Sequence, residues 1–373
     1  MRLLPKLRGA ASEVNATDVD VSQTATRNGS APEADVAQDF ALSVRNLSTV
    51  FETSVGTVQA VRDVSFDLRP SERLGIVGES GSGKSALALS ILGLIEPPGK
   101  VIGGEVLVGG RDLRKLSERQ LSGVRGQVVS LVLQDPMSAL DPVKTIGAQV
   151  VEAIAVHNPG IRRSAARKRA AELLAEVDIS DAARRLDDYP HQYSGGMRQR
   201  VAIAIAIANN PSILIADEPT TALDVTTQAQ VLALLDRLVE EHRAAVILIT
   251  HNLGIVSEFC DTVGVMYAGR FVESASCEHI FVRPTHPYTE ALLKCVPNPE
   301  RLVDGPLPAI SGFPPDLSAL PVGCSFAARC PVGKVLDRCH EQAPLARAVT
   351  GPAGEATVEC HFAQERIMLE QIS

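Results

Sequence analysis

Gly78-Glu-Ser-Gly-Ser-Gly-Lys84-Ser85 is the stretch that decides the fold of this 373-residue chain. It follows a short apolar run, Arg73–Val77, and precedes an apolar helical segment, Ser85–Leu94. A strand, a loop of the form GxxxxGK[ST] and a helix in this order are typical of a phosphate-binding loop. Glycines let successive backbone N–H groups face phosphate oxygens, and the helix N-terminus adds positive potential. The predicted nucleotide-binding residues are Gly78, Ser80, Gly81, Ser82, Gly83, Lys84 and Ser85.

Within this loop, Lys84 is expected on the β- and γ-phosphates and the Ser85 hydroxyl on Mg²⁺. A second apolar run, Ile213-Leu-Ile-Ala, ends on Asp217 and Glu218. Asp217 then lies at the end of a buried strand, where it reaches Mg²⁺ through its water shell. Glu218 is placed to polarise an attacking water as a general base. Two carboxylates alone are more often a solvated strand end, but together with the phosphate loop they predict ATP hydrolysis.

Apolar runs along the chain alternate with helical patterns, which predicts an α/β fold with a mostly parallel, covered sheet. Beyond Phe281 the chain becomes proline-rich and irregular, which indicates a small, separate C-terminal appendage. The predicted strands are Ala41–Val50, Val58–Leu68, Arg73–Val77, Gly103–Val108, Val128–Leu133, Ile213–Ala216 and Val246–Thr250. The predicted helical stretches are Ser85–Leu94, Ile146–Ala183, Ile203–Ala208 and Thr227–Glu241.

Composition excludes several classes of function. The net charge is −8, only 3% of residues are aromatic and Trp is absent, which argues against nucleic acid as a ligand. No apolar run approaches the roughly 20 residues that span a bilayer. A membrane role would therefore be peripheral and exerted through partner proteins. Residues Met1–Asp39 lack periodic apolar positions and are interpreted as a disordered tail or the product of a misassigned start codon.

Between the two nucleotide motifs lies Tyr193-Ser194-Gly195-Gly196-Met197-Arg198-Gln199-Arg200, which resembles the signature sequence of the ATP-binding-cassette superfamily. The resemblance implies that Ser194, Gly195 and Gly196 open a helix that binds the γ-phosphate of a nucleotide held by another subunit. Tyr193 and Met197 stand where the superfamily usually has Leu and Gln.

Other positions match further motifs of this superfamily. Gln134 resembles the Q-loop glutamine, which contacts Mg²⁺ and the transmembrane partner, and Asp224, in residues 222–224, resembles the D-loop aspartate. His251 resembles the switch histidine that contacts the γ-phosphate. Phe51 resembles the aromatic residue on which adenine stacks, although a core phenylalanine is the competing interpretation. Leu133 and Asn252 depart from the usual Phe and Asp, and neither departure removes a catalytic group.

Several stretches resemble one branch, the ATPases of oligopeptide and dipeptide importers, over about Phe40 to Phe362. The resemblance implies a P-loop NTPase cassette at 40–280, with a mixed sheet core, an antiparallel β subdomain and a helical subdomain near 140–205. Residues 281–373 would then form the C-terminal domain of this branch. The matching stretches are Val77-Gly-Glu-Ser-Gly-Ser-Gly-Lys-Ser85, Gln134-Asp-Pro-Met137, Tyr189-Pro-His-Gln192, Ala216-Asp-Glu-Pro-Thr-Thr-Ala-Leu-Asp-Val225, Met266-Tyr-Ala-Gly-Arg270 and His286-Pro-Tyr288.

The resemblance also implies partners and a location. The expected assembly contains a second, paralogous ATPase, two membrane permeases and an extracytoplasmic substrate-binding protein, with this chain peripheral on the cytoplasmic face of the membrane. Three alternatives remain: an importer ATPase for nickel or another small solute, a soluble cassette ATPase acting on DNA or ribosomes, and a regulatory subunit with little hydrolysis. The intact Glu218 and His251 argue against the regulatory subunit.

Four of the seven cysteines, Cys324, Cys330, Cys339 and Cys360, lie in the last fifty residues. Without a secretion signal such a group favours a metal site over disulfides, and thiolates select zinc or iron–sulfur clusters. The absence of a CxxC pair argues against a zinc ribbon. Some peptide-importer ATPases hold a four-iron, four-sulfur cluster in the corresponding segment, so the resemblance favours that cluster over zinc or free buried thiols. Cys260, Cys277 and Cys295 are predicted to be small core residues.

Overall fold

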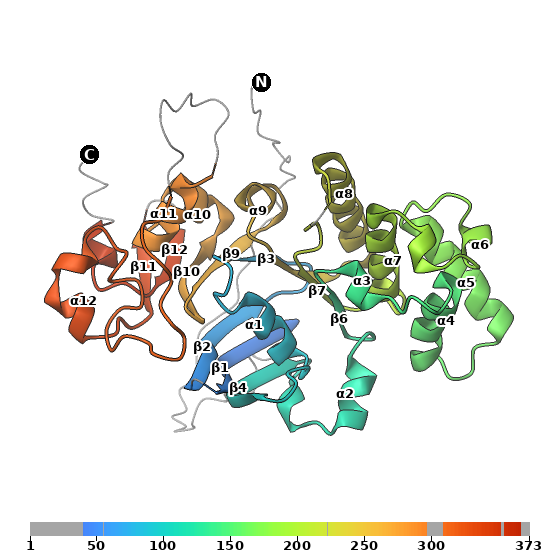
Figure 1. The fold of residues 1–373 in the computed structure, drawn as a ribbon, viewed down its shortest axis with the longest axis horizontal. Helices are drawn as coiled ribbons and strands as arrows, with labels where there is room; N and C mark the ends of the chain where they lie inside the picture. The colour runs from blue at the N-terminus through green and yellow to red at the C-terminus, as the bar shows by residue number, and fades with distance from the viewer. Residues whose placement is uncertain (1–39, 55, 222, 297–308, 352–353, 367–373) are drawn as a thin grey trace, which may run out of the picture. The chain divides into compact units, whose positions relative to one another are not determined.

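The computed structural model describes residues 40–54, 56–221, 223–296, 309–351 and 354–366 (Figure 1). The predicted disordered tail, Met1–Asp39, lies outside these ranges. The described residues belong to one compact unit of the chain. Within them, no helix combines the length and the apolar character needed to cross a bilayer.

A small antiparallel sheet forms the first layer, with strand order β2-β1-β4-β5. Alternation of apolar and polar residues turns one face inward, so that Leu42, Val44 and Leu47 are completely buried. This face packs on α1, the helix that follows the phosphate loop. The bounds are β1 Leu42–Thr53, β2 Gly56–Leu68, β4 Gly99–Val108, β5 Arg111–Asp112 and α1 Lys84–Ile91.

The second sheet has eight strands in the order β11-β12-β10-β9-β3-β8-β7-β6. From β6 to β9 neighbouring strands are parallel, and from β9 to β11 they are antiparallel. Every residue of β7 and β8 is buried, as expected for parallel strands covered on both faces. The bounds are β3 Arg73–Val77, β6 Val129–Val132, β7 Ile213–Asp217, β8 Ala245–Ile249, β9 Thr262–Tyr267, β10 Arg270–Ser276, β11 Arg347–Gly351 and β12 Gly354–Val358.

A group of helices lies beyond the β6 edge of this sheet, drawn in green in Figure 1. The long helical stretch predicted from Ile146 is divided by turns into α4, α5 and α6, and α7 packs against α4 and α5. The bounds are α4 Ile146–His157, α5 Arg163–Glu176, α6 Ala182–Arg185, α7 Gly195–Ile207 and α8 Val225–His242. The shorter helices are α2 Glu118–Val124, α3 Pro136–Ala139, α9 Leu253–Phe259, α10 Cys277–Val282, α11 Pro287–Lys294 and α12 Asp337–Glu341.

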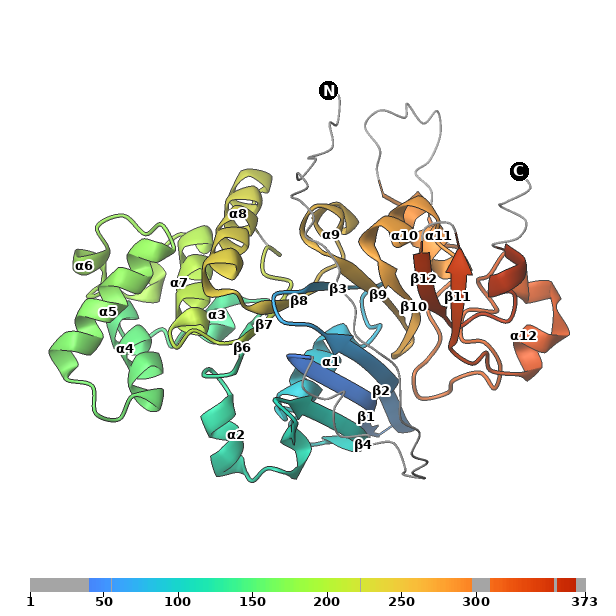
Figure 2. The same cartoon turned by 180° about the vertical axis from the view of Figure 1, so that it is seen from behind.

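The C-terminal appendage, by which we mean the described residues after 280, is less separate than the sequence predicts. Its strand β12 pairs with β10 of the cassette, and β11 extends the same sheet, as seen from behind in Figure 2. These two strands have five residues each and few apolar positions, which is too weak a pattern to identify from sequence. The sheet therefore crosses the predicted boundary at residue 280.

Candidate functional site

The phosphate loop joins β3 to α1 and is confined on two sides. A Cβ atom on Gly78 would lie 2.2 Å from the carbonyl oxygen of Met266, and one on Gly83 would lie 2.1 Å from that of Ala60. Both glycines have positive φ angles, of 156° and 106°. Only glycine fits at these two positions, because a side chain would clash with backbone that cannot move away.

The ammonium group of Lys84 lies inside this loop. Its Nζ donates to the carbonyl oxygens of Gly78 and Glu79 at 2.9 Å each. Burial lowers the pKa of Lys84, and the carboxylates of Glu218 and Asp217 oppose that shift. The predicted contact of Lys84 with the β- and γ-phosphates stays a prediction.

Asp217 ends β7 and is 6% exposed. Burial raises its pKa, while a hydrogen bond from the Ser85 hydroxyl acts in the opposite direction. Its Oδ1 atom is buried and has no hydrogen-bond partner. A buried carboxylate oxygen without a partner, next to a serine hydroxyl, is a suitable pair of oxygen ligands for Mg²⁺.

Glu218 brings together two residues that the sequence predicted separately, Gln134 and His251, and a third that it did not, Thr221. Its Oε2 accepts hydrogen bonds from Gln134 Nε2 at 2.9 Å and from the Thr221 hydroxyl at 2.7 Å. Its Oε1 lies 3.1 Å from His251 Nδ1. These side chains follow β6, β7 and β8, whose carboxyl ends meet at one edge of the sheet. Sequence reasoning missed Thr221, although its place three residues after Glu218 was a usable signal.

The backbone and the charge state of Glu218 both fit a reactive position. The residue has a left-handed backbone, with φ 47°, and its N–H donates to the carbonyl oxygen of Ile249 at 2.8 Å. Burial by itself would raise the pKa of Glu218, but hydrogen bonds from Thr221 and His251, together with the Lys84 charge, outweigh it and lower the pKa. The carboxylate is therefore ionised at neutral pH and can accept a proton.

The signature and D-loop residues begin two helices. Ser194 caps α7, its hydroxyl accepting from the N–H of Met197, and Asp224 caps α8, accepting from the N–H of Thr227. A Cβ on Gly196 would lie 2.4 Å from the Thr227 methyl group, so the two helix starts are in close contact. Ser194 and Gly195 are exposed. The hydrogen bonds described for Ser194 and Asp224 are made within their own helix starts, so neither residue joins the group around Glu218. Ala222 lies outside the described residues.

Phe51 lies half-buried in β1, opposite Gly99 of β4. A Cβ on Gly99 would be 2.6 Å from the Phe51 ring, so the ring covers that glycine. The half-buried ring packs on Gly99 and belongs to neither hydrophobic core of the described residues. Stacking of adenine on Phe51 stays a prediction.

All seven cysteines carry free thiols, and four of them gather around one cavity. Cys324, Cys330, Cys339 and Cys360 line a cavity of about 260 Å³ together with His286, Phe326 and His361. Burial raises the pKa of Cys324 to about 12, and the other three thiols of the cavity add to the rise. In the described ranges, however, no group of three or more His, Cys, Asp or Glu side chains is arranged to hold a metal ion. The predicted four-iron, four-sulfur cluster is therefore not confirmed.

Of the other three cysteines, one is buried and two are half-buried. Cys260 is buried, as predicted, and its sulfur lies 3.0 Å from the place of a Cβ on Gly75. Cys277 and Cys295 are half-buried, because each lies at a helix end and not in the centre of the core.

Comparison with known families gives two matches that together extend from β2 to α12. Residues 61–221 match the family model described as ABC transporter. Residues 272–339 match a second model, described as the oligopeptide/dipeptide transporter C-terminal region. The second match covers the segment that contains Cys324, Cys330 and Cys339.

Individual relatives are similar over most of the chain. A dipeptide transport ATP-binding protein of Bacillus subtilis is 51% identical over 291 residues, which is 78% of this chain and 86% of the relative. An oligopeptide transport ATP-binding protein of the same organism is 45% identical over 325 residues, which is 87% of this chain and 97% of the relative. Among solved structures, a dimeric ATP-binding cassette in a post-hydrolysis state with ADP and Pi has a TM-score of 0.58 and 30% identity, over 63% of this chain and 98% of that one.

Proposed function

The chain belongs to the ATP-binding subunits of oligopeptide and dipeptide ABC importers, and we propose that it hydrolyses ATP at the site above to drive peptide uptake through membrane permeases. The observation that carries the proposal is the meeting of Gln134 and His251 on the two oxygens of Glu218, at the sheet edge next to the phosphate loop.

Binding of the nucleotide is assigned to the phosphate loop. Its N–H groups and the start of α1 would surround the β- and γ-phosphates, and the Lys84 ammonium would turn from the loop carbonyls to phosphate oxygens. Ser85 and Asp217 are the residues that would hold Mg²⁺, which fits the unpartnered Oδ1 of Asp217. Gln134 would complete that side of the site. Bound there, the ion would neutralise negative charge on the phosphates.

The chemical step is assigned to Glu218. A water positioned by Glu218 and Gln134 attacks the γ-phosphorus, the bond to the bridging oxygen breaks, and ADP leaves with the electron pair. Glu218 accepts the proton of the water, which its lowered pKa allows at neutral pH. His251, whose Nδ1 lies 3.1 Å from Glu218 Oε1, would contact the γ-phosphate.

A second ATPase subunit would complete the site. Ser194 and Gly195 are exposed at the start of α7, so their N–H and hydroxyl groups are free to reach a nucleotide on a facing subunit. The related cassette that is a dimer in its post-hydrolysis state supports this arrangement. Closure of such a pair would act on two permeases, and a binding protein outside the membrane would supply the peptide. In such an assembly the chain would lie on the cytoplasmic face of the membrane.

The cysteine cavity is proposed to hold a four-iron, four-sulfur cluster on Cys324, Cys330, Cys339 and Cys360. Its support is that four thiols share one cavity and that Gly333 leaves room beside two of them. A Cβ on Gly333 would lie 3.3 Å from the sulfur of Cys330 and 3.5 Å from that of Cys339. The cluster would cross-link a loop-rich segment that has little core of its own.

Uptake by cells is the direct test of the cargo. A deletion strain should lose uptake of labelled di- and oligopeptides and recover it with the wild-type gene but not with a Lys84→Ala variant. Loss of nickel uptake with normal peptide uptake would replace peptides by nickel as the cargo. Unchanged uptake of both would contradict the transport function.

A further inference from the structure

Glu79, the second residue of the phosphate loop, is held by two side chains of the C-terminal appendage. Arg329 Nη1 and Nη2 bind its carboxylate oxygens at 2.6 and 2.9 Å, which makes a two-pronged ion pair. The N–H of Glu79 donates to the Tyr288 hydroxyl at 2.9 Å. Both contacts join parts of the chain more than 200 residues apart. Neither has a role in the ATP chemistry assigned above.

The guanidinium of Arg329 is fixed on every side. Its side chain is only 5% exposed. Nε donates to the carbonyl oxygen of Ser311 at 3.1 Å, and the charged group lies over the rings of Tyr267 and Phe326 at 5.8 and 6.0 Å. A side chain held in this way cannot follow Glu79 if the loop moves. The loop must therefore adopt the position that Arg329 sets.

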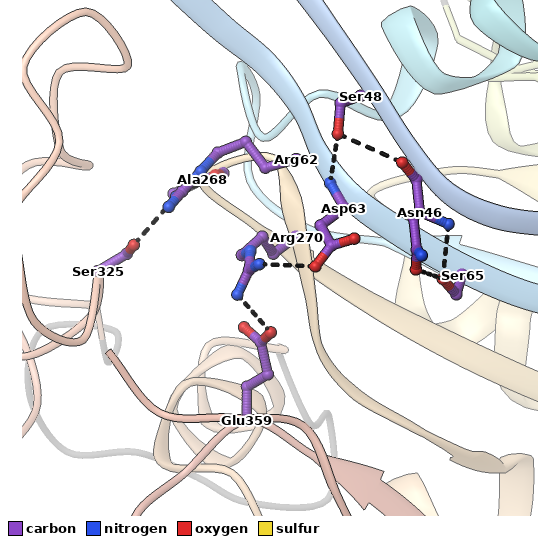
Figure 3. Close-up of polar contacts among 9 residues, drawn as sticks. All are labelled: Asn46, Ser48, Arg62, Asp63, Ser65, Ala268, Arg270, Ser325 and Glu359. Carbon is purple, nitrogen blue, oxygen red and sulfur yellow. Dashed lines mark hydrogen bonds and ion pairs between the residues drawn. The ribbon is translucent and has the colours of Figure 1, made fainter. Parts of the chain in front are cut away.

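The other end of the loop is also tied. The carbonyl oxygen of Ser82 accepts from the N–H of Gly269 at 2.9 Å, in the turn between β9 and β10. Arg62 holds that turn by donating to the carbonyl oxygen of Ala268 at 3.1 Å, and its Nη1 also reaches the Ser325 hydroxyl at 3.3 Å (Figure 3). The appendage thus contacts Glu79 directly, and through Ser325 it contacts Arg62, which holds the turn bonded to Ser82.

The energetics favour a geometric role for the Glu79–Arg329 pair. The Arg329 side chain is buried, whereas that of Glu79 is 25% exposed. Taking the Arg329 charge out of water offsets much of the attraction, so the ion pair is weak evidence for stabilisation. Here the fork of Arg329 fixes the carboxylate in one orientation. The carbonyl of the same residue, Glu79, is one of the two that hold Lys84.

We propose that Arg329 is a positioning residue for nucleotide binding, which acts through Glu79 to keep the phosphate loop in its binding shape. The proposal rests on the nucleotide site assigned above and requires no metal in the cysteine cavity. Arg329 directly precedes Cys330, so a rearrangement of the cysteine segment would reach the phosphate loop through this ion pair.

The test measures binding of the fluorescent nucleotide mant-ATP with Mg²⁺ to the purified full-length chain, with turnover in the reconstituted transporter. Arg329→Gln and Glu79→Gln should each weaken binding about tenfold, within the usual range for coupling between sites. The double variant should bind no more weakly than either single variant. Arg329→Lys, which keeps the charge without the fork, should recover part of the affinity. KM for ATP should rise, while kcat at saturating ATP should stay within about twofold of the wild-type value.

Arg270→Gln is the matched control. Arg270 pairs with Glu359 of the appendage at 2.8 Å and with Asp63 at 3.2 Å, so it joins the same parts without touching the phosphate loop (Figure 3). Its binding of mant-ATP should equal that of the wild type. Wild-type affinity in Arg329→Gln, an equal loss in Arg270→Gln, or additive effects in the double variant would each overturn the proposal. A wild-type chain that binds no mant-ATP would instead overturn the nucleotide site itself.

Discussion

At the scale of single residues, Glu218 combines ionisation with a fixed position. Both carboxylate oxygens carry hydrogen bonds, from Gln134 and Thr221 on one and at His251 on the other. A glutamine at this position would have nearly the same shape as the glutamate but could not accept a proton. The chemistry can therefore be separated from nucleotide binding at this one residue.

Glu218→Gln should lower ATP turnover in the assembled transporter by roughly 100-fold or more, the usual contribution of a general base. ATP affinity should stay close to that of the wild type, since the phosphate loop is untouched. Phosphate release from reconstituted vesicles and equilibrium nucleotide binding measure the two effects. Glu240→Gln, an exposed change on α8, is the control, and wild-type turnover in Glu218→Gln would disprove the assigned role.

The pH profile should report on the same carboxylate. A general base works while deprotonated, so turnover is lost as pH falls through its pKa, and the lowered pKa of Glu218 moves that loss to lower pH. Thr221→Val removes a donor to the carboxylate and should raise the pKa, which moves the acidic limb of kcat/KM to higher pH. The limb is measured on reconstituted transporter over the acidic range, and an unmoved limb would contradict the account.

At the scale of elements, the starts of α7 and α8 are fitted to each other. Only a glycine at position 196 leaves room for the Thr227 methyl group, because a Cβ would come within 2.4 Å of it. The signature glycine thus has a packing reason as well as its role at the proposed interface between subunits.

Gly196→Ala should cost roughly 1–3 kcal/mol through overpacking, and turnover should fall because the start of α7 is displaced. Adding Thr227→Ser removes the clashing methyl group and keeps the hydroxyl that binds Asp224 at 2.7 Å. The double variant should therefore regain stability in urea unfolding. Failure of Thr227→Ser to restore it would show that the contact is not the cause.

Glu273 of β10 organises the chain that leads to α11. Its carboxylate is completely buried and accepts the N–H groups of Thr285 and His286 at 2.7 and 3.0 Å. Burial alone would raise the pKa of Glu273, but the nearby His279 ring, whose Nε2 lies 3.7 Å from Oε1, and the two N–H groups outweigh it and lower the pKa. The two backbone hydrogen bonds hold the buried carboxylate and fix the turn before α11.

Glu273→Ala should destabilise the protein by about 3 kcal/mol, because it leaves buried N–H donors without partners. Urea unfolding of the purified chain measures the change. Glu355→Ala, at an exposed position in β12, should change stability by less than about 0.5 kcal/mol. Equal effects of the two substitutions would contradict the role of Glu273.

At the scale of the whole molecule, the appendage shares its sheet with the cassette and contacts the phosphate loop. Strand β12 adds to β10, and Arg329 reaches Glu79. The cysteine cavity lies in this same appendage. A group bound in this cavity would therefore affect how firmly the appendage is held.

Protein purified without oxygen should be brown, with broad absorption near about 400 nm and roughly four irons per chain. Cys330→Ser should lose both iron and colour, whereas Cys295→Ser, outside the cavity, should keep them. Iron analysis and absorption spectra measure this. A colourless protein that contains one zinc would replace the cluster by a zinc site.

Much of the site is readable from sequence because its motifs are local. The turn at Gly78 and Gly83, the lysine that follows, and the carboxylates at the end of an apolar run each depend on neighbouring residues alone. Strand positions were predicted to within a few residues for β1, β2, β3, β6, β7 and β8. The strands β9 to β12 were not predicted. Of these, β11 and β12 have five residues each and few apolar positions, so they carry no clear period.

By itself the sequence determined the phosphate loop, the paired acids and the family, because each is a contiguous pattern whose backbone geometry depends on its own residue types. Only the tertiary structure decided that Gln134 and His251 meet on Glu218 and that Arg329 holds Glu79 from 250 positions away. Those contacts follow from the strand order of the sheet, which brings together segments far apart in the chain. Strand order is a property of the whole fold that no local pattern encodes.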